Sequence, residues 1–523
     1  MLDGLEVSSI GNEPCGIRIR LKKIARENAS TRENKRGSSM VEVFPAERLR
    51  GRFAGVNLDE LVDVRVVRTW LYFGMVWLII TPSVGVTLSG LFTFPDYLGS
   101  EIGLTFGRLR PVHVNGVIFG AFSALFIGEC YYLLPRLCGI RVVWSQLGVP
   151  LAWMWNIAVL AGLLALPFGE NHGLEAGELP LFAEIPLFLV VATVTTQFLV
   201  TIGQRLEPPL YVALWYLIAT FVWTTMNLVL GSFILPYTIS GINSAAFHGL
   251  YIHYIVGLWL TPAGYVLIYY YLPVSARNPL YAHKLSLAGF WSLALFYPFV
   301  GIHHYLYSPI ADWAETLAIT TSMLLIIPVW TVLVNFFGTM AGKWHEFGRN
   351  LPAKFLIMGS LMYLTGCFQG STEALRSIQQ PTHFTDFVIS HSHLTVFGTF
   401  VVWAMGGLVY TWPRIFKREL WSFHLGNWSF WLITVGISTM GLVLTAAGLQ
   451  QGFQWMNGTE WLDTILWMKP YWLVRTLSGI SMDIGMSLLV VNLMMTALTR
   501  PVAAAEPQLP PRAIPVPAGG PAE

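Results

Sequence analysis

Twelve long runs of apolar residues constrain this chain more than any other feature of its sequence. Each run has roughly 20 or more residues, enough for a helix to cross about 30 Å of hydrocarbon. Of the 523 residues, 54% are apolar and only 11% are charged, a composition typical of membrane proteins. We therefore expect an all-α integral membrane protein with twelve transmembrane helices. The runs lie near residues 66–92, 111–135, 145–167, 182–203, 209–233, 244–272, 284–307, 311–340, 352–375, 383–412, 425–450 and 473–498.

The charge distribution predicts the orientation. Most lysines and arginines between the runs follow even-numbered runs, whereas one loop after an odd-numbered run holds Glu170, Glu175 and Glu178. The positive-inside rule then places both termini in the cytoplasm. Residues 1–60 are polar and lack the apolar stretch of a cleaved signal peptide, so they are predicted to be a cytoplasmic extension, with Met40 as an alternative start. Residues 61–500 would form the membrane domain, and the Pro/Ala-rich residues 501–523 a disordered cytoplasmic tail.

Charge and cysteine usage exclude other classes of protein. A net charge of +2, with basic residues scattered over short loops, provides no basic patch for a nucleic acid. The four cysteines have neither C-x-x-C nor C-x-x-C-H spacing, so the chain carries no signature of a zinc knuckle or of covalently attached c-type haem. They are Cys15, Cys130, Cys138 and Cys367. Any c-type haem must therefore belong to a partner.

Seven of the twelve histidines fall inside the predicted spans, where an ionisable residue usually has a function. His248 is assigned to helix packing. The other six lie on four spans, all in the outer half of the predicted membrane. Imidazole is a good ligand for haem iron and for copper. The shared depth therefore favours a metal cluster made by His113, His253, His303, His304, His391 and His393.

The spacing of these histidines divides them among several metals. His391 and His393 would point about 200° apart on a helix, so they cannot bind one metal but can bind two on opposite sides of their span. His303 and His304 would lie about 100° apart and could share a small metal with His253. A six-coordinate haem, a five-coordinate haem and a three-histidine copper together require these six histidines.

Four stretches carry a family resemblance. They are LTFGRLRPVH at 104–113, GLYIHYIVGLWLT at 249–261, FYPFVGIHHYLYSPIADWAETL at 296–317 and HFTDFVISHSH at 383–393. With them the chain resembles subunit I of the haem-copper oxidases, in particular the catalytic subunit of cbb3-type, or C-family, cytochrome c oxidases, from about residue 60 to 500. The resemblance implies the twelve-helix bundle of that family and a respiratory terminal oxidase that reduces O2 to water, coupled to proton uptake and pumping.

The resemblance also implies a role for each histidine. His113 and His393 would be the axial ligands of a low-spin haem b, and His391 the ligand of a high-spin haem b. The copper ion would be bound by the three remaining histidines, His253, His303 and His304. Arg475, in the stretch YWLVR, resembles an arginine that meets haem propionates, although it is equally explained as a positive residue flanking the last span.

A tyrosine and a glycine indicate the C family. In that family a tyrosine at the position of Tyr297 is crosslinked to the copper histidine of the preceding span, here His253, and supplies an electron and a proton when the O–O bond breaks. Other oxidase families place the tyrosine four residues after that histidine, where this chain has Gly257. Taken alone, a tyrosine in aromatic-rich sequence is more often a core residue.

Protons from the cytoplasm need a polar route to the outer half of the membrane. Ser286, Tyr265 and Tyr269 are candidates for it, each weak alone because aromatic residues also form interface belts. The sequence departs from the family 22 residues before His391, where Gln369 replaces a glutamate. Glu373, one turn further along, is a possible substitute or a solvated residue at the end of a span.

Three alternatives stay open on the sequence alone. A nitric oxide reductase of the same superfamily would have iron in place of copper and additional glutamates. A twelve-span transporter explains the helix count but not six histidines at one depth. An electron-transfer cytochrome leaves the adjacent histidines 303 and 304 unexplained. The partners implied by the resemblance are membrane-anchored c-type cytochrome subunits, in a bacterial inner membrane.

Overall fold

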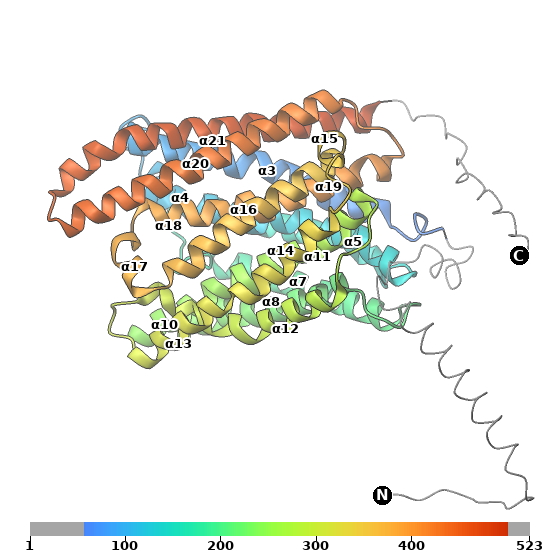
Figure 1. Ribbon diagram of the computed structural model, residues 1–523, viewed down its shortest axis with the longest axis horizontal. Coiled ribbons are helices and arrows are strands. Elements are labelled where there is room, and N and C mark those ends of the chain that lie inside the picture. Colours follow the sequence, from blue (N-terminus) through green and yellow to red (C-terminus); the bar gives the residue numbers. More distant parts are fainter. Residues whose placement is uncertain (1–56, 500–523) are drawn as a thin grey trace, which may run out of the picture.

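The computed structural model describes residues 57–499, and the long elements in this range are all helices. Twelve of them are long and apolar enough to cross a membrane, and they lie side by side as one elongated bundle (Figure 1). The predicted fold class is therefore confirmed. The spans are α3 (Val64–Thr93), α4–α5 (Phe106–Cys138), α6 with its flanking turns (Ser145–Phe168), α7 (Leu181–Gly203), α8–α9 (Val212–Thr238), α10–α11 (Gly241–Ala276), α12 with a 3₁₀ segment (His283–Tyr305), α13–α14 (Asp312–Thr339), α16 (Leu351–Glu373), α18–α19 (Asp386–Phe416), α20 (Phe423–Met456) and α21 (Trp461–Leu498).

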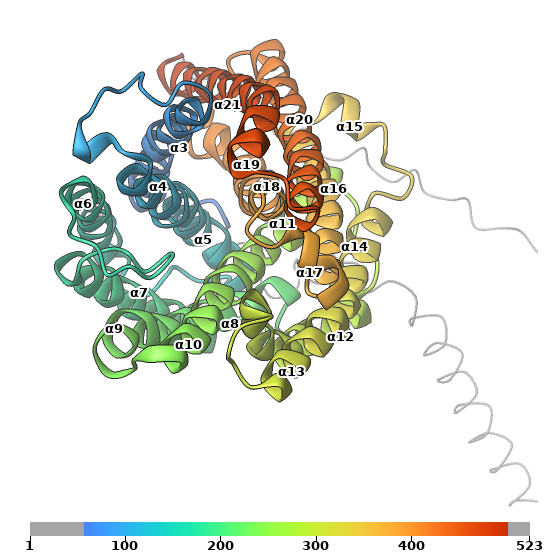
Figure 2. The ribbon, with the colours of Figure 1, turned by 90° about the vertical axis from the view of Figure 1, so that its left-hand side faces the viewer.

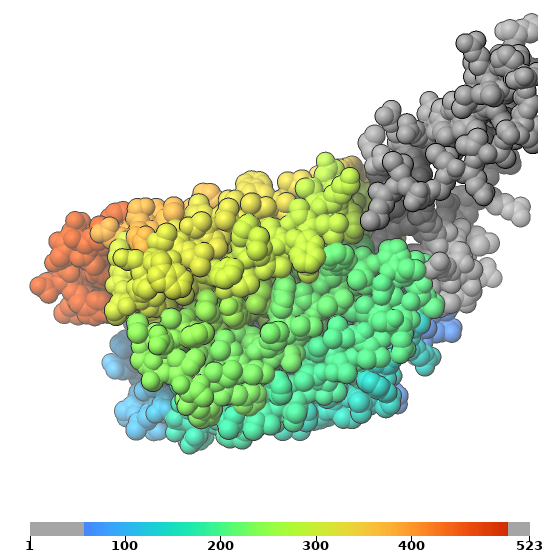
Figure 3. All heavy atoms as spheres, turned by 90° about the horizontal axis from the view of Figure 1, so that it is seen from below, coloured from blue at the N-terminus to red at the C-terminus, as the bar shows by residue number. Residues whose placement is uncertain are grey.

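The last two helices are longer than predicted. The final helix begins at Trp461 and not near 473, because its first turns include Asp463, Lys469 and Pro470 and so do not read as an apolar run. With 34 and 38 residues, α20 and α21 are each longer than about 50 Å, well above the roughly 30 Å of a bilayer core. The tip of this hairpin projects beyond the other helices at one end of the bundle (Figures 1 and 3).

The second, sixth and tenth spans share one construction. Each contains a π-helical segment in its middle, at Gly116–Phe122, Ile255–Leu260 and His393–Val401. Each then ends four residues after a proline, at a residue whose positive φ places it in the left-handed region. These residues are Gly139, Arg277 and Lys417. The chain therefore repeats a four-helix pattern three times, with a histidine-bearing span second in each unit.

These three spans form the centre of the bundle. In their most apolar stretches 100%, 94% and 94% of the residues are buried, against 61% or less in the other nine spans. Viewed along the bundle, α11 and α19 lie among the other helices (Figure 2). Full burial explains why these helices are apolar on every face, and it means that any polar side chain on them faces protein and not lipid.

The ends of the described chain, near 57 and 499, lie at the same end of the bundle (Figure 1). The predicted N-terminal extension and C-terminal tail lie almost wholly outside the described residues, as do Met40 and Cys15.

Candidate metal centre

His113 and His393 face each other across the middle of the bundle. Their ring centres are 6.3 Å apart and their planes differ by 21°. Two imidazoles that bind one iron from opposite sides, each with a nitrogen about 2 Å from the metal, place their ring centres roughly 6 Å apart. The space between the two rings therefore fits a haem iron with two axial histidines.

The backbone holds both rings in this orientation. Nδ1 of His113 lies 2.8 Å from the carbonyl oxygen of Thr81, and Nδ1 of His393 lies 2.8 Å from that of Ile389. A ring that donates its Nδ1–H to a carbonyl presents its other nitrogen to a metal. Gly85 makes the room for His113, because a Cβ at this glycine would lie 2.5 Å from Cε1 of the imidazole.

Three further histidines converge on the other side of α18. One ligand nitrogen from each of His253, His303 and His304 lies within 4.8 Å of the others. Nε2 of His253 is 2.9 Å from Nε2 of His303. Three nitrogens bound to one ion at about 2.0 Å lie roughly 3 to 4 Å apart, so the triad fits a small transition-metal ion after small shifts of the rings.

Two glycines and a serine assemble this triad. Gly249 and Gly301 allow the two histidine-bearing segments to touch, since a Cβ on Gly301 would lie 2.3 Å from the carbonyl oxygen of Gly249. Ser322 on α13 (Asp312–Leu324) holds one ligand, with its Oγ 2.7 Å from Nδ1 of His303. The sequence contains these residues, but nothing in their spacing marked them as part of the site.

The segment with His303 and His304 is a 3₁₀ helix, Tyr297–Tyr305, and not the α-helix that was predicted. Pro298 lies in its first turn and cannot donate a backbone hydrogen bond, which favours the change of geometry. With 3.0 residues per turn, Tyr297 and His303 lie two full turns apart and therefore on one face. The ring centre of Tyr297 is 5.6 Å from that of His253.

His391 points away from His393, as their spacing predicts. It lies against α16, where a Cβ on Gly370 would be 2.7 Å from its Cε1, and its ring interacts with the backbone of Gly366 on the same helix. On the same helix, Nε2 of Gln369 donates to Oγ1 of Thr445 at 2.9 Å. Glu373 is buried, so it is not a solvated residue at the end of the span.

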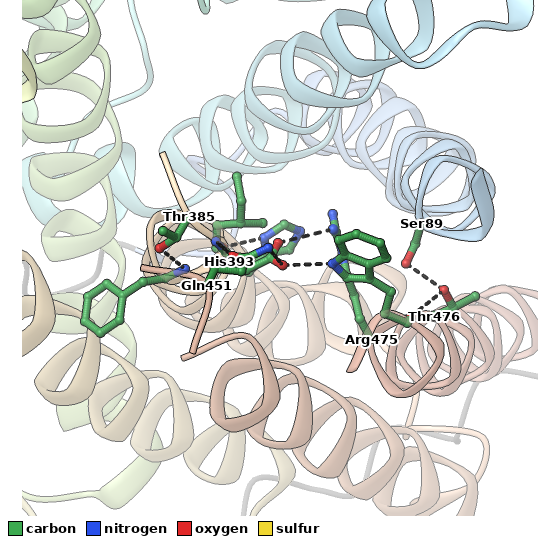
Figure 4. A network of polar contacts seen from close by, with 10 residues as sticks. Ser89, Thr385, His393, Gln451, Arg475 and Thr476 are labelled. Atoms are coloured by element: carbon green, nitrogen blue, oxygen red, sulfur yellow. Dashed lines mark hydrogen bonds and ion pairs between the residues drawn. The ribbon is translucent and has the colours of Figure 1, made fainter. Parts of the chain in front are cut away.

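Arg475 is buried beside the facing pair of histidines. Its charge interacts with both His113 and His393, and its Nη1 lies 3.9 Å from Oδ1 of Asp386 without a hydrogen bond (Figure 4). The other oxygen of Asp386 accepts hydrogen bonds from Trp472 Nε1 and Gln451 Nε2 at 2.8 and 3.1 Å. Arg475 is buried within α21 (Trp461–Leu498), and an incompletely compensated guanidinium beside this pair of histidines fits a carboxylate ligand.

The residues predicted for a polar route lie on α11 (Thr261–Ala276) and α12 (His283–Phe296), where they contact side chains of other spans. Nδ2 of Asn335 donates to Ser286 Oγ at 2.8 Å and lies 3.5 Å from the hydroxyl of Tyr269. Tyr265 is hydrogen-bonded to Tyr363. Sequence reasoning missed Asn335 and Tyr363, which lie on other spans and follow no recognisable spacing.

Tyr363 continues the route toward the metal positions. Its hydroxyl is hydrogen-bonded to the thiol of Cys367, one turn further along α16, and that thiol interacts with Tyr297. The rings of Tyr269 and Tyr265 are both in contact with Tyr216, at 5.7 and 4.9 Å between ring centres. Hydroxyl and thiol groups therefore occur at intervals between Ser286 and the tyrosine beside the histidine triad, and from Tyr269 to Tyr265 the contact runs through the ring of Tyr216.

At the end of the bundle opposite to residues 57 and 499, two polar residues are hydrogen-bonded to neighbouring segments. Nε2 of His248 lies 3.3 Å from the carbonyl oxygen of Glu175, and its Nδ1 lies 3.2 Å from the hydroxyl of Tyr305, in line with the predicted packing role. Glu178 is buried in the loop before α7 and accepts a hydrogen bond from Asn115 Nδ2 at 2.7 Å. Burial raises the pKa of Glu178 to about 6.

The fold and the site define a multi-span membrane protein whose helices hold one facing pair of histidines, one histidine triad and a single histidine between them. Residues 65–481 match the family Cytochrome C and Quinol oxidase polypeptide I. The chain belongs to this family of haem-copper oxidase subunits I, as its resemblance predicted. Family membership makes it an oxidoreductase of the haem-copper type and implies haem and copper as cofactors.

Individual relatives cover most of the chain. A cytochrome c oxidase subunit 1 homolog of Agrobacterium tumefaciens (strain T37) is 29% identical, with 84% of each chain aligned. The cbb3-type cytochrome c oxidase subunit CcoN1 of Stutzerimonas stutzeri is 28% identical over 82% of this chain and 94% of its own. A solved haem-copper terminal oxidase dimer is 17% identical and shares the fold, with a TM-score of 0.70 over 84% of this chain and 85% of its own.

Proposed function

We propose that this chain is the catalytic subunit of a cbb3-like respiratory terminal oxidase that reduces O2 to water with electrons from c-type cytochromes. The observation that carries the proposal is the convergence of the His253, His303 and His304 nitrogens within 4.8 Å, with Tyr297 beside them. In the proposed assignment these three histidines bind one copper ion. His391, on a neighbouring span, binds a high-spin haem b.

His113 and His393 are the proposed axial ligands of a low-spin haem b. The 6.3 Å between their ring centres and their carbonyl-bound Nδ1 atoms support this assignment. Arg475 is the proposed partner of haem propionates, since its Nη1 has no hydrogen-bond partner among the described residues. When bound, the haems and the copper supply the redox chemistry, and the protein orients them and controls access of water.

Tyr297 is the proposed catalytic side chain. Its hydroxyl group supplies one proton and one electron to oxygen, so that the metals need to supply one electron fewer at that moment. The resemblance to C-family oxidases assigns this role, and two observations support it. Its ring lies against that of His253, and it is on the same 3₁₀ face as His303.

Protons for water formation reach Tyr297 through the contacts that begin at Ser286. Each water formed consumes two protons, and apolar helix surfaces alone cannot bring them to a buried centre. Ser286, Asn335 and Tyr269 form the entrance, and Tyr265 and Tyr363 the middle. Gln369 cannot titrate, so Glu373 is the acid that remains on this face of α16.

The proposed setting is a bacterial inner membrane with the end that contains residues 57 and 499 in the cytoplasm. The arginine and lysine bias of the loops supports this orientation, and so does the position of both described ends on one side (Figure 1). The CcoN1 relative is a subunit of a cbb3-type oxidase, which supports a complex with membrane-anchored c-type cytochrome subunits. Such partners would supply the haem groups that this chain has no motif to attach covalently.

Metal analysis combined with gas consumption tests the function. The purified complex should contain one copper in addition to its haem iron, and after reduction it should consume O2 faster than nitric oxide. Non-haem iron without copper, together with faster turnover of nitric oxide, would establish the reductase alternative. Colourless protein would exclude both enzymes and favour the transporter.

A further inference from the structure

A buried glutamate lies outside the proposed metal sites and outside the Ser286 route. Glu129 is on α5 (Ser123–Cys138), in the same span as His113 and 16 residues after it. Its side chain is 0% exposed, and neither carboxyl oxygen has a hydrogen-bond partner among the described residues. An isolated carboxylate is strongly disfavoured in a membrane interior, so Glu129 carries a proton in this state.

The surrounding helices leave a space for this carboxyl group. On α19 (Val402–Phe416), a Cβ at Gly407 would lie 2.4 Å from Oε2 of Glu129 and 2.6 Å from Cε2 of Tyr271. The titratable groups that interact with Glu129 are the hydroxyl of Tyr271 on α11 and the thiol of Cys130, and neither is charged at neutral pH. Among the described residues, therefore, no cation neutralises the Glu129 carboxylate in place of its proton.

Polar groups connect this region with the cytoplasmic end. The hydroxyl of Tyr271 is 2.8 Å from Oγ1 of Thr411, and its ring packs on Tyr410 at 5.4 Å. The guanidinium of Arg414 lies 3.5 Å from the centre of the Tyr410 ring. Nearby, Arg136 donates to the hydroxyl of Tyr270 at 3.0 Å.

Arg136 also forms an ion pair with Asp59, which is 70% exposed. Charged groups at the surface and hydroxyl groups below them therefore lie on the cytoplasmic side of Glu129, where protons are taken up.

The polar residues around Glu129 are separate from the Ser286 route. Tyr269 and Tyr271 are two residues apart on α11 and so point about 200° from each other. On the side of Glu129 toward the metal positions, Phe126 packs on Trp259 with 5.3 Å between ring centres, and Phe400 packs on Trp403 at 6.0 Å. Polar side chains thus lie on the cytoplasmic side of Glu129, and aromatic rings lie on the side toward the histidine triad.

We propose that Glu129 is a second proton-binding site, loaded from the cytoplasmic end through the Tyr271–Thr411 pair and distinct from the route that feeds oxygen chemistry. It accepts a proton from water at the cytoplasmic end and releases one when the charge of the buried centre changes, so no electron or other group is transferred. A site with this access serves protons that are translocated and not consumed. The inference rests on the proposed oxidase function.

The test compares protons with electrons. The complete complex is reconstituted in vesicles and given oxygen pulses, and protons released outside are counted per electron consumed. Glu129→Gln should lose net proton release while O2 consumption continues, and Glu129→Asp should restore part of the release. Glu184→Gln, which alters another buried glutamate in the first turn of α7, at the opposite end of the bundle from the cytoplasmic end, should change neither quantity. Normal proton release in Glu129→Gln overturns the proposal.

Infrared difference spectra give a readout that does not depend on turnover. Reduction of the wild-type complex should change a carboxylic acid C=O band that shifts in D2O and is missing in Glu129→Gln, and Tyr271→Phe should slow its appearance. An unchanged band in Glu129→Gln overturns the proposal. If that variant does not assemble, Tyr271→Phe decides, because loss of proton release supports the route and normal release contradicts it. Wild-type protein that consumes no O2 would instead refute the oxidase function.

Discussion

The ring of Tyr297 occupies the space that any side chain at Gly257 would need. A Cβ on Gly257 would lie 1.7 Å from Cε1 and 1.8 Å from Cζ of the tyrosine. Gly257 is one helical turn after His253, which is the position where other oxidase families carry their tyrosine. The phenol thus reaches the same spot beside the same histidine from a different helix, and the glycine is required for it to do so.

Gly257→Ala should therefore displace Tyr297 and leave the histidines in place. We expect both haem signals to persist and O2 turnover to fall by about a hundredfold, since an error of about 1 Å in a reacting group can cost that much. The measurement is steady-state O2 consumption per haem. Gly203→Ala is the control, because a Cβ there meets no atom within 4 Å. Full activity in Gly257→Ala would remove Tyr297 from the mechanism.

Gly85→Ala should remove the low-spin haem. The new Cβ would lie 2.5 Å from Cε1 of His113 and push the imidazole away from its partner His393. The reduced-minus-oxidised spectrum should then show one b-type haem per chain instead of two. Gly107→Ala, on the same helix as His113 but with open space around it, should keep both. Two intact haems in Gly85→Ala would contradict the assignment of His113.

Ser322→Ala should weaken copper binding without altering a ligand. The serine hydroxyl lies 2.7 Å from Nδ1 of His303, and loss of such a partner typically reduces metal affinity about 10- to 100-fold. Copper per haem should fall more rapidly than in the wild type during dialysis against a chelator. Thr320→Ala, which removes an exposed hydroxyl on the same helix, should behave like the wild type. Equal copper retention in both variants would argue against the triad as the copper site.

Ser286→Ala should slow proton delivery but keep every metal. Its Oγ is buried and accepts from Asn335 Nδ2 at 2.8 Å, at the entrance of the proposed route. Turnover should fall about a hundredfold, the lower end of the range for loss of a proton-transfer group, with unchanged haem spectra and a larger solvent deuterium effect. Ser292→Ala, whose hydroxyl bonds within its own helix, provides the control. Unchanged turnover in Ser286→Ala would show that protons enter elsewhere.

The sequence predicted the membrane spans better than the ends and the local geometry of the helices. The twelve spans were predictable because an apolar run of sufficient length has few alternatives to a membrane helix. The predicted start of the last helix was wrong, because the first turns of this helix are polar enough to resemble a loop. The 3₁₀ segment at Tyr297–Tyr305 was read as α-helix, because Pro298 and Gly301 permit either geometry and only packing selects one.

By itself the sequence determined the membrane fold, the family and the six histidines, since hydrophobic length and residue spacing act along the chain. Only the tertiary structure decided how Tyr297 meets His253, which glycines allow helices and imidazoles to approach, and how Asn335, Tyr363 and Cys367 extend the Ser286 route. It also placed Glu129 without a partner at the centre of the bundle. These relationships join residues far apart in sequence, and close packing between helices, which no local pattern records, sets their distances.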